Sequence, residues 1–170
     1  LCSHGLIERG ARVAVIDLDA HRGNGIAQIH RDDPSVLIFD MYNCRTYPRD
    51  KETVARIDCP IPLEPLTSDD EYLLQLQRNL PAFLEQHGPF ALAIYNAGTD
   101  VYMDDPLGGL SLSAAGILER DLCTTAELSK RGIPWLSVTS GGYTQESAGL
   151  IAASAIQVIR RAVVVPSESS

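Results

Sequence analysis

An apolar run near the beginning of the sequence ends in two carboxylates and an imidazole at every second position. The polar residues are Asp17, Asp19 and His21, and Leu18 and Ala20 alternate with them. Side chains of extended backbone alternate between two faces, so the three polar groups are expected on one side. Charge that is buried at a strand end without a partner is costly, and a divalent cation is the simplest partner. The spacing therefore predicts a strand end that carries a metal ion in a hydrolase.

A third candidate ligand follows a later apolar run. Asp100 comes shortly after residues 90–95, and in open α/β sheets ligands bind beyond the carboxyl ends of the strands. We therefore expect Asp19, His21 and Asp100 to meet there as one nitrogen and two oxygen donors. Three protein ligands leave a position for water, which is typical of catalytic zinc, and Fe(II) also suits this set.

A tyrosine lies at another predicted strand end. Tyr143 follows Gly141 and Gly142, shortly after the apolar residues 134–138. A phenol in this place could hydrogen-bond a substrate carbonyl and stabilise the oxyanion as it forms. The residues alone leave a second interpretation open, in which the two glycines form only a turn and Tyr143 is a surface residue.

Apolar and amphipathic segments alternate along the chain, which predicts a parallel sheet with covering helices. Strands are expected at residues 11–18, 35–41, 54–61, 90–95 and 134–138, and helices at residues 26–31, 67–88, 113–130 and 144–162. Pro60 and Pro62 would confine the third strand to a sheet edge, and Pro81 could kink the long helix.

The composition indicates one globular domain. With 170 residues the chain can build a core, and its net charge of -8 without a basic patch argues against a nucleic-acid surface. Four cysteines lack C-x-x-C spacing, so we expect reduced thiols and a cytoplasmic location; they are Cys2, Cys44, Cys59 and Cys123. No apolar run reaches membrane-spanning length, and the oligomeric state is not readable from the sequence.

Four segments together resemble the zinc-dependent histone deacetylase family. They are Asp17-Leu-Asp-Ala-His-Arg-Gly-Asn-Gly25, Tyr95-Asn-Ala-Gly-Thr-Asp100, Asp105-Pro-Leu-Gly-Gly-Leu-Ser-Leu-Ser113 and Thr139-Ser-Gly-Gly-Tyr143. The second segment is most similar to the class IV branch and its bacterial relatives. The resemblance implies a three-layer α/β/α fold of the arginase/deacetylase kind, with a mainly parallel sheet that is incomplete at the N-terminal side.

The resemblance also implies roles for individual residues. Asp19, His21 and Asp100 match the zinc ligands, and Tyr143 matches the tyrosine that polarises the acyl carbonyl. The implied reaction is hydrolysis of an N-acyl-lysine amide. Other matches are Asp17 with the acid that pairs with a catalytic histidine, Asp17, Asp40 and Met41 with a structural potassium site, and Leu107 and Gly142 with the wall of the acyl-lysine tunnel.

One part of the family pattern is missing. The family has a His-His pair, serving as general base and acid, about thirty-five residues before the Asp-x-Asp-x-His strand, and only sixteen residues precede Asp17 here. His4 is single and too close to take this role. We therefore expect residues 1–165 to be the C-terminal portion of a deacetylase domain, residues 166–170 to be a tail, and the isolated chain to be inactive.

Three other functions stay open at this point. An acetylpolyamine or other small N-acyl amine hydrolase would need acidic groups at the tunnel mouth, and Asp104 and Asp105 do not decide this. An arginase-like enzyme with two manganese ions would need another carboxylate after His21, where Gly23 and Asn24 stand. A non-catalytic interaction module that keeps the fold is the third alternative.

Overall fold

The computed structural model describes residues 8, 10–49 and 52–164. The strands are β1 (Val13–Asp17), β2 (Val36–Asn43), β3 (Cys59–Leu63), β4 (Leu92–Asn96) and β5 (Trp135–Val138). The helices are α1 (Asn24–Ile29), the 3-10 turn η2 (Val54–Arg56), α2 (Asp69–His87), α3 (Ala114–Lys130) and α4 (Ser147–Val164). Among the described helices, none is both long and apolar enough to cross a bilayer.

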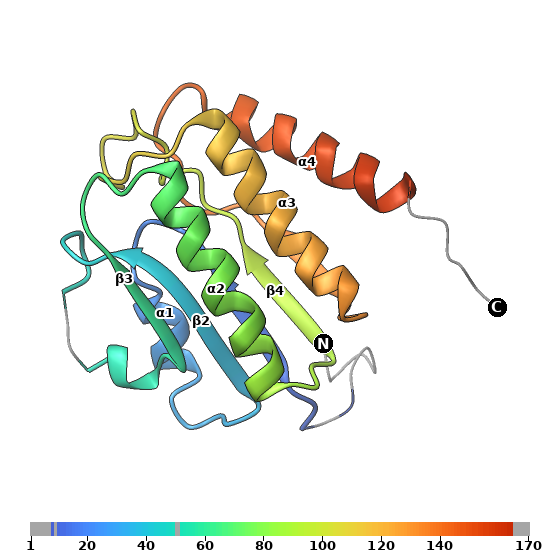
Figure 1. Ribbon diagram of the computed structural model, residues 1–170. Coiled ribbons are helices and arrows are strands. Elements are labelled where there is room, and N and C mark those ends of the chain that lie inside the picture. Colours follow the sequence, from blue (N-terminus) through green and yellow to red (C-terminus); the bar gives the residue numbers. More distant parts are fainter. Residues whose placement is uncertain (1–7, 9, 50–51, 165–170) are drawn as a thin grey trace.

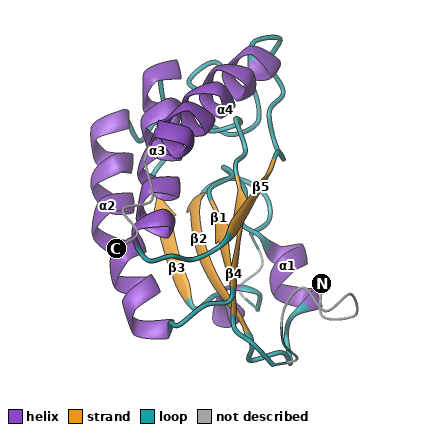
Figure 2. Ribbon diagram, turned by 90° about the vertical axis from the view of Figure 1, so that its right-hand side faces the viewer, coloured by secondary structure: helices purple, strands orange, loops and turns teal. Residues whose placement is uncertain are grey.

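The five strands form one parallel sheet in the order β3-β2-β1-β4-β5. Helices α2, α3 and α4 lie on one side of the sheet and α1 lies on the other, which makes three layers (Figures 1 and 2). The predicted α/β fold is therefore confirmed. Because β1 lies between β2 and β4, the segment that follows β1 leaves the sheet at the middle of the row formed by the carboxyl ends of the strands.

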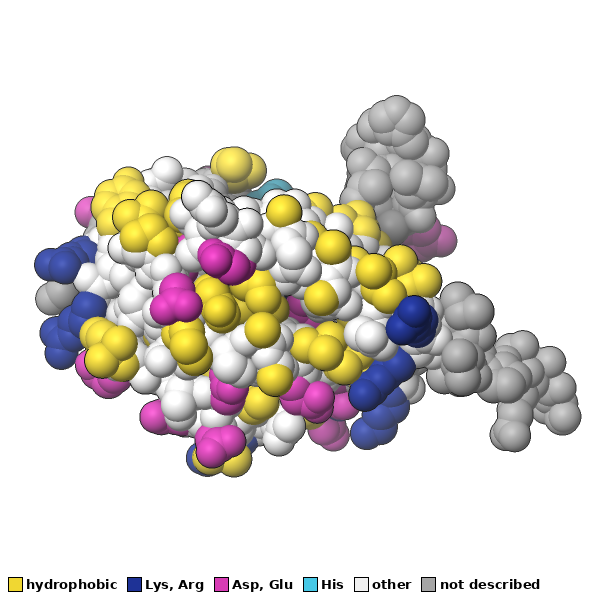
Figure 3. Space-filling view, turned by 90° about the horizontal axis from the view of Figure 1, so that it is seen from above, with side chains coloured by type: hydrophobic (Ala, Val, Ile, Leu, Met, Phe, Trp, Pro, Cys, Tyr) yellow, Lys and Arg dark blue, Asp and Glu magenta, His cyan; other side chains and the backbone are white. Residues whose placement is uncertain are grey.

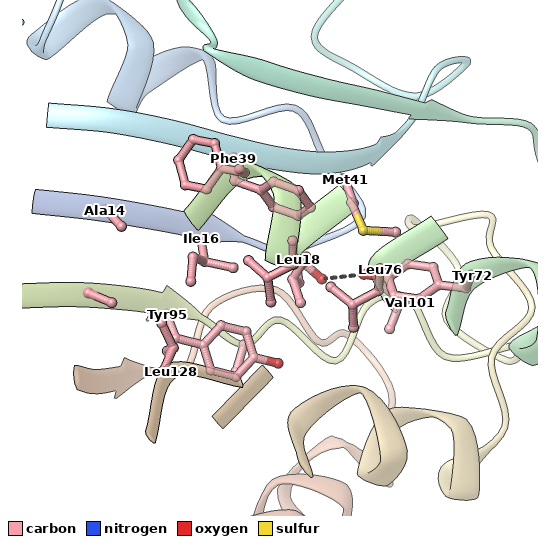
Figure 4. Packing of buried hydrophobic residues seen from close by; sticks show 14 of the residues in the cluster. Ala14, Ile16, Leu18, Phe39, Met41, Tyr72, Leu76, Tyr95, Val101 and Leu128 are labelled. Carbon is pink, nitrogen blue, oxygen red and sulfur yellow. Dashed lines mark hydrogen bonds between the residues drawn. The ribbon is translucent and has the colours of Figure 1, made fainter. Parts of the chain in front are cut away.

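Alternation along β1 divides the core between the two faces. Ala14, Ile16 and Leu18 belong to the large apolar cluster under α2 and α3, whereas Val15 belongs to a smaller cluster with Ala27 of α1. Leu18 continues the large cluster beyond the strand (Figure 4). Ala20 belongs to the same cluster. The face opposite Leu18 is therefore the one on which Asp17 lies.

The predicted strand at 54–61 is wrong in its first half. Residues 54–56 form η2, and β3 begins only at Cys59. The Arg56 guanidinium donates to the carbonyl oxygens of His30, Asp33 and Val36 at 2.8, 3.0 and 2.7 Å, which holds the turn against the end of α1. β3 does lie at the sheet edge, as its prolines require.

The helix boundaries follow their capping signals. The Ser113 hydroxyl accepts a hydrogen bond from the Gly116 amide at 3.0 Å and begins α3 as predicted. The Ser113 hydroxyl and amide donate to Asp69 at 2.6 and 2.8 Å, which ties the N-termini of α2 and α3 together. Helix α2 continues through Pro81 to His87.

Candidate metal centre

The three predicted ligands converge beyond the carboxyl ends of β1 and β4. Nδ1 of His21 lies 2.9 Å from Oδ2 of Asp100 and 3.2 Å from Oδ1 of Asp19. One candidate ligand atom from each residue falls within 4.8 Å of the others, and this is the one such group among the described residues. Segments about eighty residues apart in sequence thus supply one nitrogen and two carboxylates to the same point.

Main-chain donors hold both carboxylates in place. Oδ1 of Asp19 accepts the His21 amide at 2.8 Å, and Oδ1 of Asp100 accepts the Ala20 amide at 2.8 Å. Oδ2 of Asp19 accepts the Ser140 hydroxyl at 2.8 Å and the Gly141 amide at 3.0 Å. The segment after β5 therefore orients a ligand that the segment after β1 supplies.

Two glycines leave room for these carboxylates. A Cβ atom on Gly141 would lie 2.1 Å from Oδ2 of Asp100 and 2.7 Å from Oδ2 of Asp19. A Cβ atom on Gly98 would lie 2.9 Å from the same oxygen of Asp19 and 3.0 Å from Oδ1 of Asp100. Any side chain at either position would have to displace a candidate ligand.

The charges of the three groups depend on one another. Hydrogen bonds to Asp100 and Asp19 raise the pKa of His21 to about 10. Burial raises the pKa of Asp100. Burial also acts to raise the pKa of Asp19, but hydrogen bonds led by that from His21 bring it below its usual range. The two carboxylates thus favour a positive charge at the point toward which Nδ1 of His21 is directed. One imidazole nitrogen and two carboxylates are a set of ligands that fits a divalent cation such as zinc.

Asp17 and Asp40 form a second acidic pair behind this centre. They are partners in the register of β1 and β2 and are almost completely buried. Asp17 accepts from the Asn96 amide group at 2.7 Å, and Asp40 accepts from the Gly23 amide at 2.9 Å. Burial and the charge of Asp19 raise the pKa of Asp17 to about 7, and burial with the charge of Asp17 raises that of Asp40.

This acidic pair is compatible with the predicted potassium site. Oδ1 of Asp40 is buried and has no hydrogen-bond partner among the described residues. The Met41 side chain lies in the apolar cluster under α2 and α3 (Figure 4), so it does not face the pair, and the residue could offer only main-chain atoms to a cation. The potassium site stays a prediction.

Tyr143 lies beside the predicted ligands at the surface. Its ring is 6.3 Å from the His21 ring, centroid to centroid, in an edge-on arrangement. Burial and the charges of Asp100 and Asp19 raise its pKa, so the hydroxyl keeps its proton. The side chain is 54% exposed, which leaves it accessible to a substrate.

The two predicted tunnel residues occupy neighbouring loops. Leu107 is exposed, in the turn that leads to Gly108, where a Cβ atom would overlap the Asp100 carbonyl. Gly142 has a φ of 156° and faces the Thr99 hydroxyl, where a Cβ atom would lie 2.2 Å away. Leu107 therefore lies in the loop that follows the candidate ligand Asp100, and Gly142 directly precedes Tyr143. His4 lies outside the described residues.

Asp105 begins one of the segments that resemble the family, but the sequence assigned it no role in holding the site. Its Oδ1 accepts the amides of Leu107 and Gly108 at 2.9 and 3.0 Å, and its Oδ2 accepts the Tyr143 amide at 2.8 Å. It therefore joins the 105–108 turn to the tyrosine. An aspartate followed by Pro and Gly is a turn signal that could have predicted the first half of this role.

Figure 3 looks down on one end of the molecule, where acidic and hydrophobic side chains share the middle of the surface and basic side chains lie at its sides. Among the described residues on this face there is no continuous basic patch. A nucleic-acid surface would need clustered Lys and Arg, and its absence stays a prediction from the net charge.

Comparison with known proteins gives a consistent result. Residues 3–159 match the histone deacetylase domain family. Histone deacetylase 2 of Arabidopsis thaliana is 41% identical over 166 residues, which are 96% of this chain and 43% of that protein. A probable deacetylase of Archaeoglobus fulgidus is 31% identical over 88% of this chain and 46% of its own length.

Solved structures agree with the sequence comparison. An acetylpolyamine aminohydrolase from Burkholderia pseudomallei has a TM-score of 0.74 at 25% identity and covers 87% of this chain and 44% of its own. A histone deacetylase homologue shares the fold with a TM-score of 0.73, over 94% of this chain and 44% of its own. The chain thus spans less than half the length of these relatives. On the strength of the domain match and the Arabidopsis relative, the chain belongs to the histone deacetylase family.

Proposed function

We propose that this chain carries the metal centre and the carbonyl-polarising tyrosine of a zinc-dependent hydrolase that acts on N-acyl-lysine. The observation that carries the proposal is the convergence of Asp19, His21 and Asp100 beside Tyr143. Family membership supports deacetylase-type hydrolysis. The class IV assignment stays a prediction.

Each residue has a distinct task in this proposal. Asp19, His21 and Asp100 would hold the metal ion, with Fe(II) as the alternative to zinc. When bound, such an ion polarises a carbonyl and lowers the pKa of water. The Tyr143 hydroxyl donates a hydrogen bond to the acyl oxygen as negative charge develops there. Its raised pKa keeps the proton available for this bond.

Proton transfer is the task that the family resemblance assigns to a His-His pair, and this sequence contains no such pair. Its four histidines are His4, His21, His30 and His87, and no two are adjacent. His21 is used as a ligand. His30 follows the C-terminal end of α1, and His87 is the last residue of α2. We therefore predict that the 170-residue chain by itself binds zinc and does not hydrolyse acyl-lysine at a measurable rate.

The metal assignment is tested by zinc titration of the protein with a competing chromophoric chelator. Asp19→Ala should abolish tight binding, because it removes one of three ligands. Asp104→Ala is the matched control, since Asp104 is an exposed carboxylate on a nearby loop. Equal zinc affinity in the wild type and in Asp19→Ala would refute the ligand assignment.

The reaction is tested with the product of the whole reading frame that contains this chain. We expect it to release acetate from an acetyl-lysine peptide, followed by mass spectrometry. Zinc binding without any hydrolysis by that product would favour the non-catalytic alternative.

A small acylated amine is the second candidate substrate, because an acetylpolyamine aminohydrolase shares this fold at 25% identity. Polyamine cations need acidic groups at the site mouth. Both Asp105 oxygens already accept main-chain amides, so of the two adjacent acids only the exposed Asp104 is oriented toward solvent. The two substrates are distinguished by measuring kcat/KM of the product of the whole reading frame for an acetyl-lysine peptide and for an acetylated polyamine. We expect a higher kcat/KM for the peptide.

A further inference from the structure

A buried arginine contacts both segments that carry the candidate ligands. Arg120 of α3 is fully buried. Its Nη1 donates to the Leu18 carbonyl at 3.1 Å and to the Gly98 carbonyl at 2.6 Å. Leu18 directly precedes Asp19, and Gly98 is two residues before Asp100. A single nitrogen thus joins the segment after β1 to the segment after β4.

The guanidinium is itself fixed in orientation. Its Nε donates to Oδ1 of Asp121 at 2.8 Å, and Nη2 lies 2.8 Å from the same oxygen. Asp121 also accepts hydrogen bonds from the Tyr95 hydroxyl of β4 and the Ser154 hydroxyl of α4. Three elements therefore hold the planar group that faces the two carbonyls, and a planar guanidinium transmits that constraint better than a flexible ammonium.

A second helix contacts the same point. The Tyr72 hydroxyl of α2 lies 3.5 Å from the Leu18 carbonyl oxygen (Figure 4), so α2 and α3 both fix the peptide group that precedes Asp19. A buried ion pair seldom adds net stability over an apolar replacement of the same volume. Stability alone therefore gives a weak reason for a fully buried arginine here, whereas the placement of two ligand segments gives a specific one.

We propose that Arg120 is a positioning residue that sets the separation of the two ligand-bearing segments and thereby the affinity of the metal centre. The inference rests on the proposed function. One nitrogen that bonds both carbonyls limits how far the segments can move apart. Ligand distances in metal sites are tolerant only to about 0.2 Å, so a small change in that separation weakens binding.

The test is the zinc affinity of Arg120→Lys, measured by chelator competition. Lysine keeps a positive charge, but its single nitrogen cannot face Asp121 and both carbonyls in the way that the separate Nε, Nη2 and Nη1 atoms of arginine do. We expect zinc binding to weaken roughly 10- to 100-fold, the usual effect of losing a partner outside the ligand shell. The absorption spectrum of the cobalt-loaded variant should also change, because the ligand geometry changes.

Leu128→Ala is the control, because Leu128 is a fully buried residue of the same helix whose aliphatic side chain cannot hydrogen-bond to either segment. It should lower the unfolding temperature without changing the zinc affinity of the folded protein. A folded Arg120→Lys variant with wild-type affinity and an unchanged cobalt spectrum would overturn the proposal.

A second variant covers the case in which Arg120→Lys does not fold. Asp121→Asn keeps one oxygen, which can still accept from the Tyr95 hydroxyl, and places an amide group opposite the Ser154 hydroxyl. It removes the charge that orients Arg120, so zinc binding should again weaken. Unchanged affinity in this variant overturns the role of Arg120 and leaves the metal centre intact. Failure of the wild type to bind zinc overturns the proposed function, and the role of Arg120 with it.

Discussion

Replacing Gly141 by alanine should damage the metal centre through one methyl group. The added Cβ would lie 2.1 Å from Oδ2 of Asp100, whereas ordinary contact begins near 3.4 Å, so that oxygen must move by about 1.3 Å. This displacement is several times the tolerance of about 0.2 Å in metal–ligand distances. The backbone φ of Gly141 is not positive, so the expected effect is steric and owes nothing to backbone strain.

We expect the zinc Kd of Gly141→Ala to rise by roughly 100-fold or more, which is about 2.8 kcal/mol at 1.4 kcal/mol per tenfold. Chelator competition measures the affinity, and circular dichroism checks that the variant is folded. Gly149→Ala is the matched control, because a Cβ there meets nothing within 4 Å in α4. A folded Gly141→Ala variant that binds zinc as tightly as Gly149→Ala would refute the proposed arrangement of the carboxylates.

Three further predictions test the tyrosine, its loop and the core. Tyr143→Phe, made in the product of the whole reading frame, should lower kcat about 10²- to 10³-fold with zinc retained, as when one oxyanion donor is lost. An unchanged kcat would show that the hydroxyl takes no part in the reaction. Asp105→Asn should lower the free energy of unfolding by about 1–3 kcal/mol in urea titrations, because an amide group would face a main-chain donor, and Asp104→Asn should change it by no more than about 0.5 kcal/mol. Leu76→Ala, at a core position that is 1% exposed, should lower the free energy of unfolding by about 2–5 kcal/mol. Leu74→Ala, on the exposed side of α2, should leave the free energy of unfolding nearly unchanged. Similar losses in both variants would contradict the assigned core face of α2.

The order of strands and helices could be predicted because each depends on local pattern. β1 and β4 are short apolar runs bounded by polar residues, and α3 begins at the serine that its sequence identified as a cap. The segment at 54–58 could not be predicted in this way. Its 3-10 turn depends on Arg56 reaching the carbonyls of residues 30, 33 and 36, and a local pattern does not reveal such contacts.

The sequence by itself determined which side chains could bind a metal ion. Asp19 and His21 follow one strand and Asp100 another, and parallel strands bring their carboxyl ends to the same edge. Ligand type and strand order are therefore properties of residue identity and periodicity. The predicted meeting of these three groups required no knowledge of side-chain packing.

Only the tertiary structure decided how those ligands are held. Asp105 reaches the Tyr143 amide, Ser140 reaches Asp19, and Arg120 reaches Leu18 over a separation of 102 residues. Such contacts depend on how α3 and the loops pack over the strand ends, so residue spacing cannot reveal them. The chemistry of the centre is thus set by local sequence, and its geometry by hydrogen bonds between segments that become neighbours only after folding.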